Sequence, residues 1–367
     1  MKKIIALFGF IAVLIACSSS DNEGEVANNN YDRTALLTNW ADHIIIPAYE
    51  NYQSKINTLS TAATAYTTAP TTASLQALRT SWFEAYKAYQ YVALYNFGKA
   101  QDISFKEMSN TYPADAIKID GDIASGNYNL AVFASFTRQG FPGLDYLING
   151  LAANDTAIVT LYSAANYKNY LLAVVAKMKS NADAIVADWN GGYRETYISN
   201  NGTSVSSSVS KTTNSFVKSF ERDIRSGKVG FPAGIFSNNV PRPTDVEAYY
   251  KKDISKTLLN TSVTAAKDFF NGKHFNAAGS GEGLKSYLDY MNAVRDGQKL
   301  SDIINTQFAL VETTNNLLNN NFITQINTDN QKMINAYTTM QQNLIYLKLD
   351  MMQALNITID YVDGDGD

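Results

Sequence analysis

Apolar side chains recur every three or four residues along most of the chain, and this spacing constrains the fold more than any other feature. Between residues 34 and 59 the apolar positions follow the period of a single helix face. No pair of alternating apolar runs is joined by a tight hairpin turn, and strand-like and helix-like segments do not alternate. The sequence therefore predicts an all-α protein.

Interruptions of the helical pattern set the expected helix boundaries. We expect one helix from Thr34 with a kink at Pro47, and a second from Thr71 or Thr72 that stops at Gly98. Residues 99–128 are polar with scattered glycine and proline, and predict a long loop. Further helices are expected from Leu130 into the motif described below, at 156–189, around Phe216, and at about 244–271, 283–296, 299–320 and 328–357.

The N-terminus has the pattern of an export signal. Lys2 and Lys3 precede an apolar stretch, Ile4 to Ala16, which is too short to span a bilayer. Leu14-Ile15-Ala16-Cys17 resembles the lipobox of bacterial lipoproteins, so we expect cleavage before Cys17 and a diacylglycerol on its thiol. Cys17 is the one cysteine of the chain, which excludes an intrachain disulfide and a thiolate metal cluster. The pattern predicts an outer-membrane lipoprotein, on the periplasmic or the cell-surface face.

These features predict five segments. They are a signal peptide (1–16), a flexible tether (17–33), an N-terminal helical bundle (34–190), a C-terminal helical bundle (191–359) and an acidic tail (360–367). Gly-Phe-Pro occurs at Gly140 and again at Gly230. A duplication of helical halves would produce that echo, and so would chance. We expect two related bundles packed into one compact body, and leave internal duplication open.

The charge balance excludes one class of partner. Thirty basic and 34 acidic side chains give a net charge of −4. Binding to nucleic acid needs a basic patch or stripe, and the sequence has none. The 23 tyrosines, with many asparagines and threonines, suit either the helix surfaces of an extracytoplasmic protein or a glycan-stacking surface.

The sharpest local irregularity lies between Arg138 and Gly150. Two glycines and a proline break the apolar pattern there, which predicts a kink or a restart of the helix. Such breaks occur at functional sites and at packing corners alike. The segment Gly140-Phe141-Pro142-Gly143-Leu144-Asp145 resembles the G-x-H-x-x-E motif of the imelysin-like family, whose founders were described as insulin-cleaving metallopeptidases.

Other stretches are similar to that family in their order and spacing, and together they cover most of residues 34–350. The resemblance implies an all-α fold of two related bundles, an extracytoplasmic location and a link to iron uptake. The stretches that carry it are Ile46–Tyr49, Trp82–Tyr89 with Phe97-Gly98, Trp189–Gly202, Asn214, Phe216 and Glu221 before Lys228–Gly234, and Val246–Tyr250.

The departures from the family motif bear on metal binding. In the family, the motif histidine and glutamate stand three residues apart on one helix face and share a cation. Here Pro142 and Asp145 occupy those positions, and Ala93 stands where metal-binding relatives carry a glutamate. A catalytic zinc site needs about three protein ligands, and neither His43 nor His274 lies in an H-E-x-x-H pattern. We therefore assign no catalytic residue and no definite cofactor, and keep a divalent metal or iron open.

Asp145 is the one retained metal-ligand candidate, and it has two interpretations. It is a structural carboxylate that caps the restarted helix or pairs with Arg138, or it forms a weak oxygen-ligand site with Glu247 or Glu221.

Three functions follow from these observations. The leading hypothesis is a non-catalytic lipoprotein that binds a small ligand or a protein partner in a groove beside residues 138–150, within iron or haem acquisition. The alternatives are a residual metal-dependent peptidase and a glycan-binding surface lipoprotein. Candidate groove residues are Arg138, Gly140, Phe141, Pro142, Gly143 and Asp145, with Tyr89, Glu221 and Glu247 as further ligand-binding candidates.

Overall fold

The computed structural model describes residues 30–362. Cys17, the predicted signal peptide, most of the predicted tether and residues 363–367 of the acidic tail lie outside the described residues. From Asp32 onward the chain forms one compact unit. Helices make up almost all of its regular structure, which confirms the all-α prediction.

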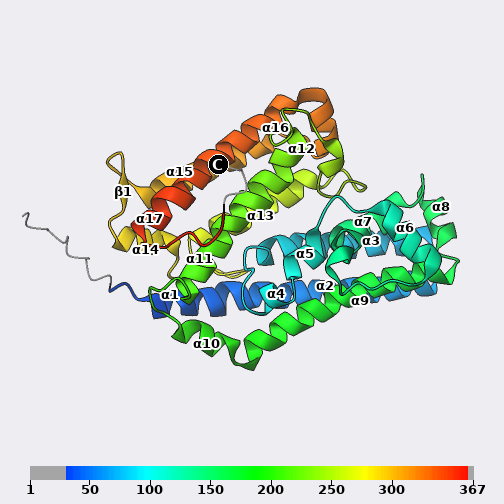
Figure 1. Cartoon of the computed structure of the whole chain (residues 1–367), viewed down its shortest axis with the longest axis horizontal. Helices are drawn as coiled ribbons and strands as arrows, with labels where there is room; N and C mark the ends of the chain where they lie inside the picture. The colour runs from blue at the N-terminus through cyan, green and yellow to red at the C-terminus, as the bar shows by residue number, and fades with distance from the viewer. Residues whose placement is uncertain (1–29, 363–367) are drawn as a thin grey trace, which may run out of the picture. The chain divides into compact units, whose positions relative to one another are not determined.

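Three long helices form the first bundle of this unit (Figure 1). They are α2 (Ile46–Thr68), α3 (Thr72–Val92) and α9 (Ala165–Asp188). Helix α2 packs against both α3 and α9, and its buried face carries Tyr49, Tyr52 and Ile56. The apolar spacing of the sequence thus places one stripe of α2 in the core, as the helical period requires.

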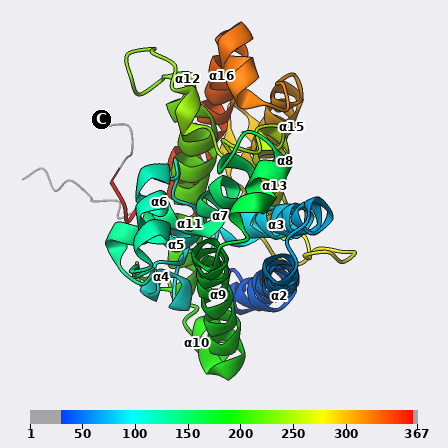
Figure 2. The ribbon, with the colours of Figure 1, turned by 90° about the vertical axis from the view of Figure 1, so that its right-hand side faces the viewer.

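The second bundle is built from the C-terminal half. It contains α13 (Ser255–Phe270), α15 (Leu300–Asn316), α16 (Phe322–Ile345) and the π-helical segment η5 (Ser219–Gly230). Helix α13 contacts both α3 and α15, so it joins the two bundles. Figure 2 shows the end of the first bundle, with α12 beside α16 above it. The two-bundle arrangement does not by itself establish an internal duplication.

The remaining elements are short and connect the long helices. They are α1 (Arg33–Asn39), η1 (Trp40–Ile45), α4 (Lys99–Asp102), α5 (Phe105–Asn110), α6 (Ala116–Ser125), η2 (Phe133–Arg138), α7 (Gly140–Asp145), η3 (Tyr146–Gly150), α8 (Asp155–Leu161), η4 (Trp189–Tyr193), α10 (Arg194–Ser199), α11 (Ser208–Lys218), α12 (Phe231–Ala233), η6 (Pro243–Asp245), α14 (Leu284–Tyr290), β1 (Val294–Arg295), β2 (Gln298–Lys299), η7 (Tyr346–Met351) and α17 (Met352–Ala354).

Local sequence signals explain several helix boundaries. Thr71 caps α3 in a capping box, because its side chain accepts from Ser74 N while the Ser74 hydroxyl accepts from Thr71 N. At Pro47 the expected kink takes the form of a π-helical turn, η1, that ends just before the proline. Proline has no N–H to donate, and the widened turn before it accommodates the missing hydrogen bond.

Some expected boundaries were wrong. Helix α3 ends at Val92 and not at Gly98, and the expected helix over 156–189 is broken between Leu161 and Ala165. The predicted loop over 99–128 contains α4, α5 and α6. Helix α6 is capped at its start by the Asp115 side chain and ends at Ser125, with Gly126 at φ +64 as its C-cap. These short helices pack on the first bundle, where burial stabilises pieces too short to be stable alone.

Two further expectations also differ from the structure. Residues 246–254 are not helical, so the helix expected from about 244 begins at Ser255. A two-residue strand pair, β1 with β2, closes around Asp296 and Gly297, although no hairpin was expected. Within residues 30–362, no helix has the length and apolar character needed to cross a bilayer.

Gly140 at the start of α7 gives a test of the packing at the motif. Its φ is +67, and a Cβ there would lie 2.2 Å from the Ser109 carbonyl oxygen. We expect Gly140→Ala to lower the free energy of unfolding by about 3 kcal/mol, from left-handed strain and overpacking. Urea unfolding measures it, with Gly121→Ala as the matched control, since a Cβ at helical Gly121 would meet nothing within 4 Å. A loss below about 1 kcal/mol would contradict the packing described.

Candidate functional site

The Gly-Phe-Pro-Gly segment is a helix restart. Gln139 is extended, Gly140 takes a left-handed conformation, and α7 begins there. Pro142 lies in the first turn of α7, where a missing N–H costs no helical hydrogen bond. Every residue from Gln139 to Ile148 is buried. The motif is therefore part of the core, as the restart prediction allowed.

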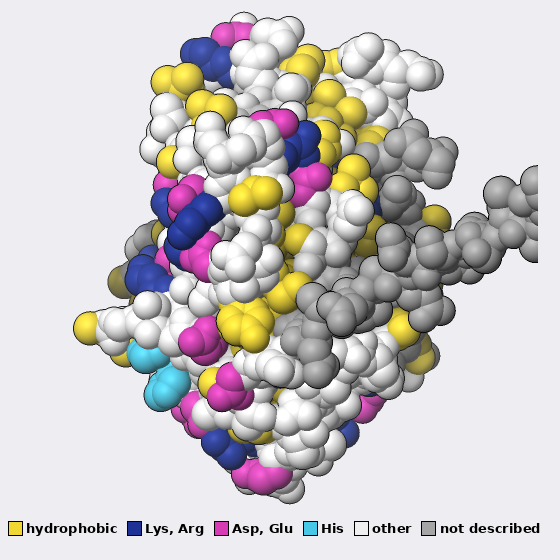
Figure 3. Space-filling model, turned by 90° about the vertical axis from the view of Figure 1, so that its left-hand side faces the viewer, with side chains coloured by type: hydrophobic (Ala, Val, Ile, Leu, Met, Phe, Trp, Pro, Cys, Tyr) yellow, Lys and Arg dark blue, Asp and Glu magenta, His cyan; other side chains and the backbone are white. Residues whose placement is uncertain are grey.

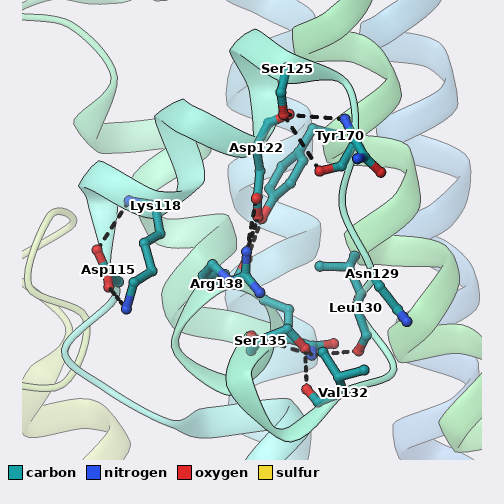
Figure 4. A network of polar contacts seen from close by, with 12 residues as sticks. Asp115, Lys118, Asp122, Ser125, Asn129, Leu130, Val132, Ser135, Arg138 and Tyr170 are labelled. Atoms are coloured by element: carbon teal, nitrogen blue, oxygen red, sulfur yellow. Dashed lines mark hydrogen bonds and ion pairs between the residues drawn. The ribbon is translucent and has the colours of Figure 1, made fainter.

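A polar network holds the approach to this restart in place (Figure 4). Arg138 Nη1 donates to both carboxylate oxygens of Asp122, at 2.8 and 2.7 Å, and Tyr170 Oη donates to the Arg138 carbonyl at 2.9 Å. Gln139 Nε2 donates to the Leu130 carbonyl at 2.7 Å. These bonds close residues 130–138 into a turn, so the helix expected from Leu130 into the motif is replaced by the short 3-10 segment η2.

Aromatic packing surrounds the motif on its other side. The Phe141 ring stacks on Tyr86 with centroids 4.3 Å apart, and Trp82 Nε1 donates to the Phe141 carbonyl at 3.2 Å. The Phe141 ring also lies 5.4 Å from the Tyr89 ring, and Ala93, the C-cap of α3, follows Tyr89 by four residues, about one helical turn.

The Asp145 carboxylate binds main-chain groups of a distant loop. Its oxygens accept from Tyr250 N at 2.8 Å, from Lys251 N at 3.0 Å and from Asn149 Nδ2 at 3.0 Å. Burial raises the pKa of Asp145 to about 7, although these three hydrogen bonds and the Lys251 charge lower it. Asp145 is thus a structural carboxylate, but it neither caps its own helix nor pairs with Arg138, which binds Asp122.

The loop that Asp145 holds, Val246–Lys252, carries Glu247 into the interior. Ala248 has φ +58 and Lys252 has φ +70, both in the left-handed region that residues with a Cβ rarely adopt. Backbone in this region persists only where the surrounding contacts determine it. Here those contacts are the Asp145 carboxylate and the bond from Ser255 Oγ to the Glu247 carbonyl at 3.0 Å.

Glu247 forms a buried ion pair with Lys228 of η5. The Lys228 Nζ to Glu247 Oε2 distance is 2.5 Å, and the two side chains are 4% and 2% exposed. Asn110 Nδ2 donates to the other Glu247 oxygen at 2.8 Å, and Tyr86 Oη donates to Asn110 Oδ1. Burial raises the pKa of Tyr86 well above its ordinary value, so its hydroxyl keeps the proton that it donates.

A cavity of about 390 Å³ lies beside this ion pair, between η5 and the α3–α5 region. Its wall includes the cationic side chains Lys106, Lys218, Arg222 and Lys228 and the acidic side chains Glu107 and Asp223. Lys106 pairs with Asp223, which also accepts from Ser219 Oγ at 2.6 Å. The other lining residues are Tyr89, Gln90, Ala93, Leu94, Asn96, Asn110, Thr111, Tyr112, Ser219, Ile224, Gly227, Phe231 and Ser262.

Two polar atoms of residues in this wall have no partner within the described protein. Asn96 Oδ1 and Arg222 Nε are buried and make no hydrogen bond there. Both atoms are screened from solvent, so they do not open onto the cavity, although the side chains that carry them line its wall together with Tyr89, Tyr112 and Phe231. A buried donor or acceptor without a partner costs free energy.

The predicted site residues divide into three groups. Tyr89 lines the cavity, and Glu247 bonds to two of its lining residues, Lys228 and Asn110. Glu221 lies in a separate cluster, where its Oε2 accepts from Lys348 Nζ at 2.7 Å and from Tyr361 Oη at 2.9 Å. Residues 138–150 do not line the cavity, so the ligand groove expected beside them is not at this place. Within the described part of the chain, no three His, Cys, Asp or Glu side chains are grouped to hold a metal ion.

Several residues of this site were not expected from the sequence. Lys228 stands within a stretch that resembles the family, but nothing in its spacing pairs it with Glu247. Asn110, Lys106 and Tyr112 belong to the segment that was predicted as a loop. The one available signal was the length of that polar segment, because long connections in compact proteins are usually functional or fold back on the core.

The fold and the buried motif define an all-α protein of imelysin-like architecture. A solved imelysin-like protein from Psychrobacter arcticum has a TM-score of 0.70 at 18% identity, covering 90% of this chain and 97% of that one. A solved structure from Parabacteroides distasonis, described as an iron-regulated protein A precursor, has a TM-score of 0.70 at 16% identity, with 87% and 95% covered.

Sequence comparison agrees with this architecture. The Imelysin family model matches residues 45–348. Iron-regulated protein A of Synechococcus elongatus is 21% identical over 262 residues, which are 67% of this chain and 68% of that protein. The chain belongs to the imelysin family, and the resemblance inferred from its motifs is confirmed.

The buried Lys228–Glu247 pair predicts a large and specific loss of stability. We expect Glu247→Gln to lower the free energy of unfolding by about 3–5 kcal/mol, because it leaves the Lys228 ammonium buried without a counter-charge. The double variant Lys228→Met/Glu247→Gln should recover much of that loss. Denaturant unfolding of both variants measures the coupling.

The half-buried surface pair Glu84–Lys87, at 2.7 Å, is the matched control, and Glu84→Gln should cost less than about 0.5 kcal/mol. Equal losses for Glu247→Gln and for the double variant would show that Lys228 and Glu247 are not energetically coupled.

Asp145 predicts a pH dependence with a definite sign. Its pKa in the folded protein, about 7, lies above the ordinary value of 3.8, so the folded state binds more protons between these values. The free energy of unfolding should therefore fall as the pH rises from about 4 to about 7, and this contribution should level off above that. Asp145→Asn has no proton to release, so we expect this part of the slope to vanish. The prediction is contradicted if the free energy of unfolding changes with pH by the same amount in the wild type and in Asp145→Asn across this range.

Proposed function

We propose that this imelysin family member is a lipid-anchored binding protein without peptidase activity, which takes an anionic small molecule into the cavity beside Lys228. The lipid anchor rests on the lipobox at Cys17, which predicts attachment at the outer membrane. The work of such a protein would be iron or haem acquisition, since relatives carry the description iron-regulated protein A.

The absence of peptidase activity is proposed because the buried carboxylates already have protein partners. Glu247 pairs with Lys228, Glu221 accepts from Lys348, and Asp145 accepts two main-chain N–H groups. A metal-dependent peptidase needs about three ligands free to meet one ion. A protein ammonium group stands against Glu247 and another against Glu221, where a cation would otherwise neutralise the carboxylate.

The charge of the cavity wall supports an anionic ligand. Of the charged side chains in the wall, Lys106 is paired with Asp223, and Lys228 is paired with Glu247. The remaining charges are those of Lys218 and Arg222 against Glu107, which leaves the wall net positive. The volume of about 390 Å³ suits a small molecule. Such a wall would repel a bare ferrous or ferric ion but would attract iron held in an anionic chelate, whose carboxylates can accept from Arg222 and Lys218. An anionic iron chelate would therefore be consistent both with a role in iron acquisition and with the positive charge of the cavity.

The alternative of glycan binding has less support. A stacking surface would need a row of exposed tyrosine rings. Among the described residues only Tyr290 is a clearly exposed tyrosine, at 49%, while most of the others pack in or against the core. The abundant tyrosines therefore serve the aromatic packing of the two bundles.

Binding of a defined chelate tests the proposal. We expect ferric citrate, and the redox-inert gallium citrate, to bind the purified protein in isothermal titration. Arg222→Gln should weaken binding by about tenfold or more, because a charge-assisted hydrogen bond contributes about 1.5–3 kcal/mol. Lys179→Gln, an exposed lysine on α9, is the matched control and should leave binding unchanged.

Two results would overturn the proposal. One is a failure of the titration, in which neither chelate binds the protein or the Arg222 variant binds as tightly as the wild type. The other is cleavage of an unfolded protein substrate in the presence of Zn²⁺ that disappears in Asp145→Ala, since that would assign the motif a catalytic role.

A further inference from the structure

The two histidines of the chain, far apart in sequence, meet in the folded protein. His43 and His274 are the only histidines among the 367 residues. Their ring centroids lie 4.4 Å apart, with 25° between the ring planes. Figure 3 shows the histidine side chains, in cyan, lying together on the surface. This pairing is separate from the motif and from the proposed function.

Main-chain contacts fix both histidines. His43 lies in the π-helical turn η1, and its carbonyl accepts from Phe275 N at 2.7 Å. His274 N donates to the Gly279 carbonyl at 3.1 Å, and a bridge between Lys273 and Ser280 closes the loop. The hydrogen bond from Phe275 therefore connects the segments that carry the two imidazoles. The rings lie together because main-chain hydrogen bonds hold both segments in place.

The imidazole nitrogens are available. Within residues 30–362, no hydrogen bond or ion pair engages either imidazole ring. Both rings line an open depression of about 570 Å³, whose wall also contains Asp32 and Glu282. Gly279 faces the ring of His274, and a Cβ there would lie 3.4 Å from Nδ1. The glycine keeps that edge of the ring uncrowded.

We propose that His43 and His274 together bind one divalent transition-metal ion, of the kind that prefers imidazole ligands. Imidazole suits Zn²⁺, Cu²⁺ and Ni²⁺, and metal–nitrogen bonds near 2.0–2.1 Å place two nitrogens on one ion about 3–4 Å apart. The rings lie stacked, with 25° between their planes, and a ring nitrogen binds a metal in the plane of its ring. Both side chains must therefore rotate before one nitrogen of each points at the same ion, and neither side chain is buried.

The remaining coordination positions belong to water. The described residues supply no third histidine, cysteine or carboxylate close enough to complete a three-residue set. Asp32 and Glu282 line the same depression, and their negative charge favours a cation there. A site of this composition holds an exchangeable ion at the surface, in contrast to a closed structural zinc site with four protein ligands.

Zinc titration followed by NMR gives a direct test, because the chain has only two imidazoles to observe. The whole chain, purified without a histidine tag, is labelled with ¹⁵N, and its imidazole signals are followed as Zn²⁺ is added. We expect both rings to shift together and to saturate at one ion per chain. Isothermal titration with Zn²⁺ and Cu²⁺ should give the same stoichiometry, with tighter binding of Cu²⁺.

Variants separate the proposal from its alternatives. His43→Asn and His274→Asn should each weaken Zn²⁺ binding by about tenfold or more, since changes even to outer-shell partners cost that much. Thr38→Ala, in the same depression, is the matched control and should bind as the wild type does. The proposal is overturned if Zn²⁺ shifts only one imidazole, if it shifts neither, or if the double histidine variant binds as tightly as the wild type.

Discussion

The ion pair between Lys228 and Glu247 is the interaction on which the junction of the two bundles depends. It joins η5 of the second bundle to the loop Val246–Lys252, and Asn110 extends it to α5 and Tyr86 of the first. Both charged side chains are almost fully buried, so neither can be left without the other. The left-handed residues Ala248 and Lys252 show that the loop adopts a backbone it would not choose in isolation.

Asp145 completes this junction from the side of the motif. Its carboxylate accepts hydrogen bonds from the N–H groups of Tyr250 and Lys251, which are partly buried and need partners. The motif position that resembles a metal-ligand position in the family is thus used here to hold backbone. This use explains why a carboxylate is kept beside Pro142, although proline cannot act as a ligand. The same carboxylate is what couples the stability of the loop to pH.

The two proposed binding places use different chemistry. The cavity beside Lys228 presents ammonium and guanidinium groups, which suit an anionic molecule. The depression at His43 and His274 presents imidazole nitrogens and two carboxylates, which suit a cation. An iron-related protein that carries both would handle a metal in two forms, as a chelate in the cavity and as an exchangeable ion at the surface. The experiments on each are independent of the other.

The sequence by itself determined the helical class, the family and the restart at Gly140. Helix periodicity follows from 3.6 residues per turn. A proline between two glycines interrupts that periodicity through local backbone geometry, whatever the tertiary contacts. Asp115 and Gly126, which cap α6, are local signals within the polar segment 99–128, but a cap without a long apolar stripe does not by itself predict a helix. Only the tertiary structure decided that residues 246–254 are not helical, that Lys228 meets Glu247, and that His43 meets His274. These outcomes depend on contacts between residues far apart in the chain, whose energies exceed local helix propensity and leave no trace in local spacing.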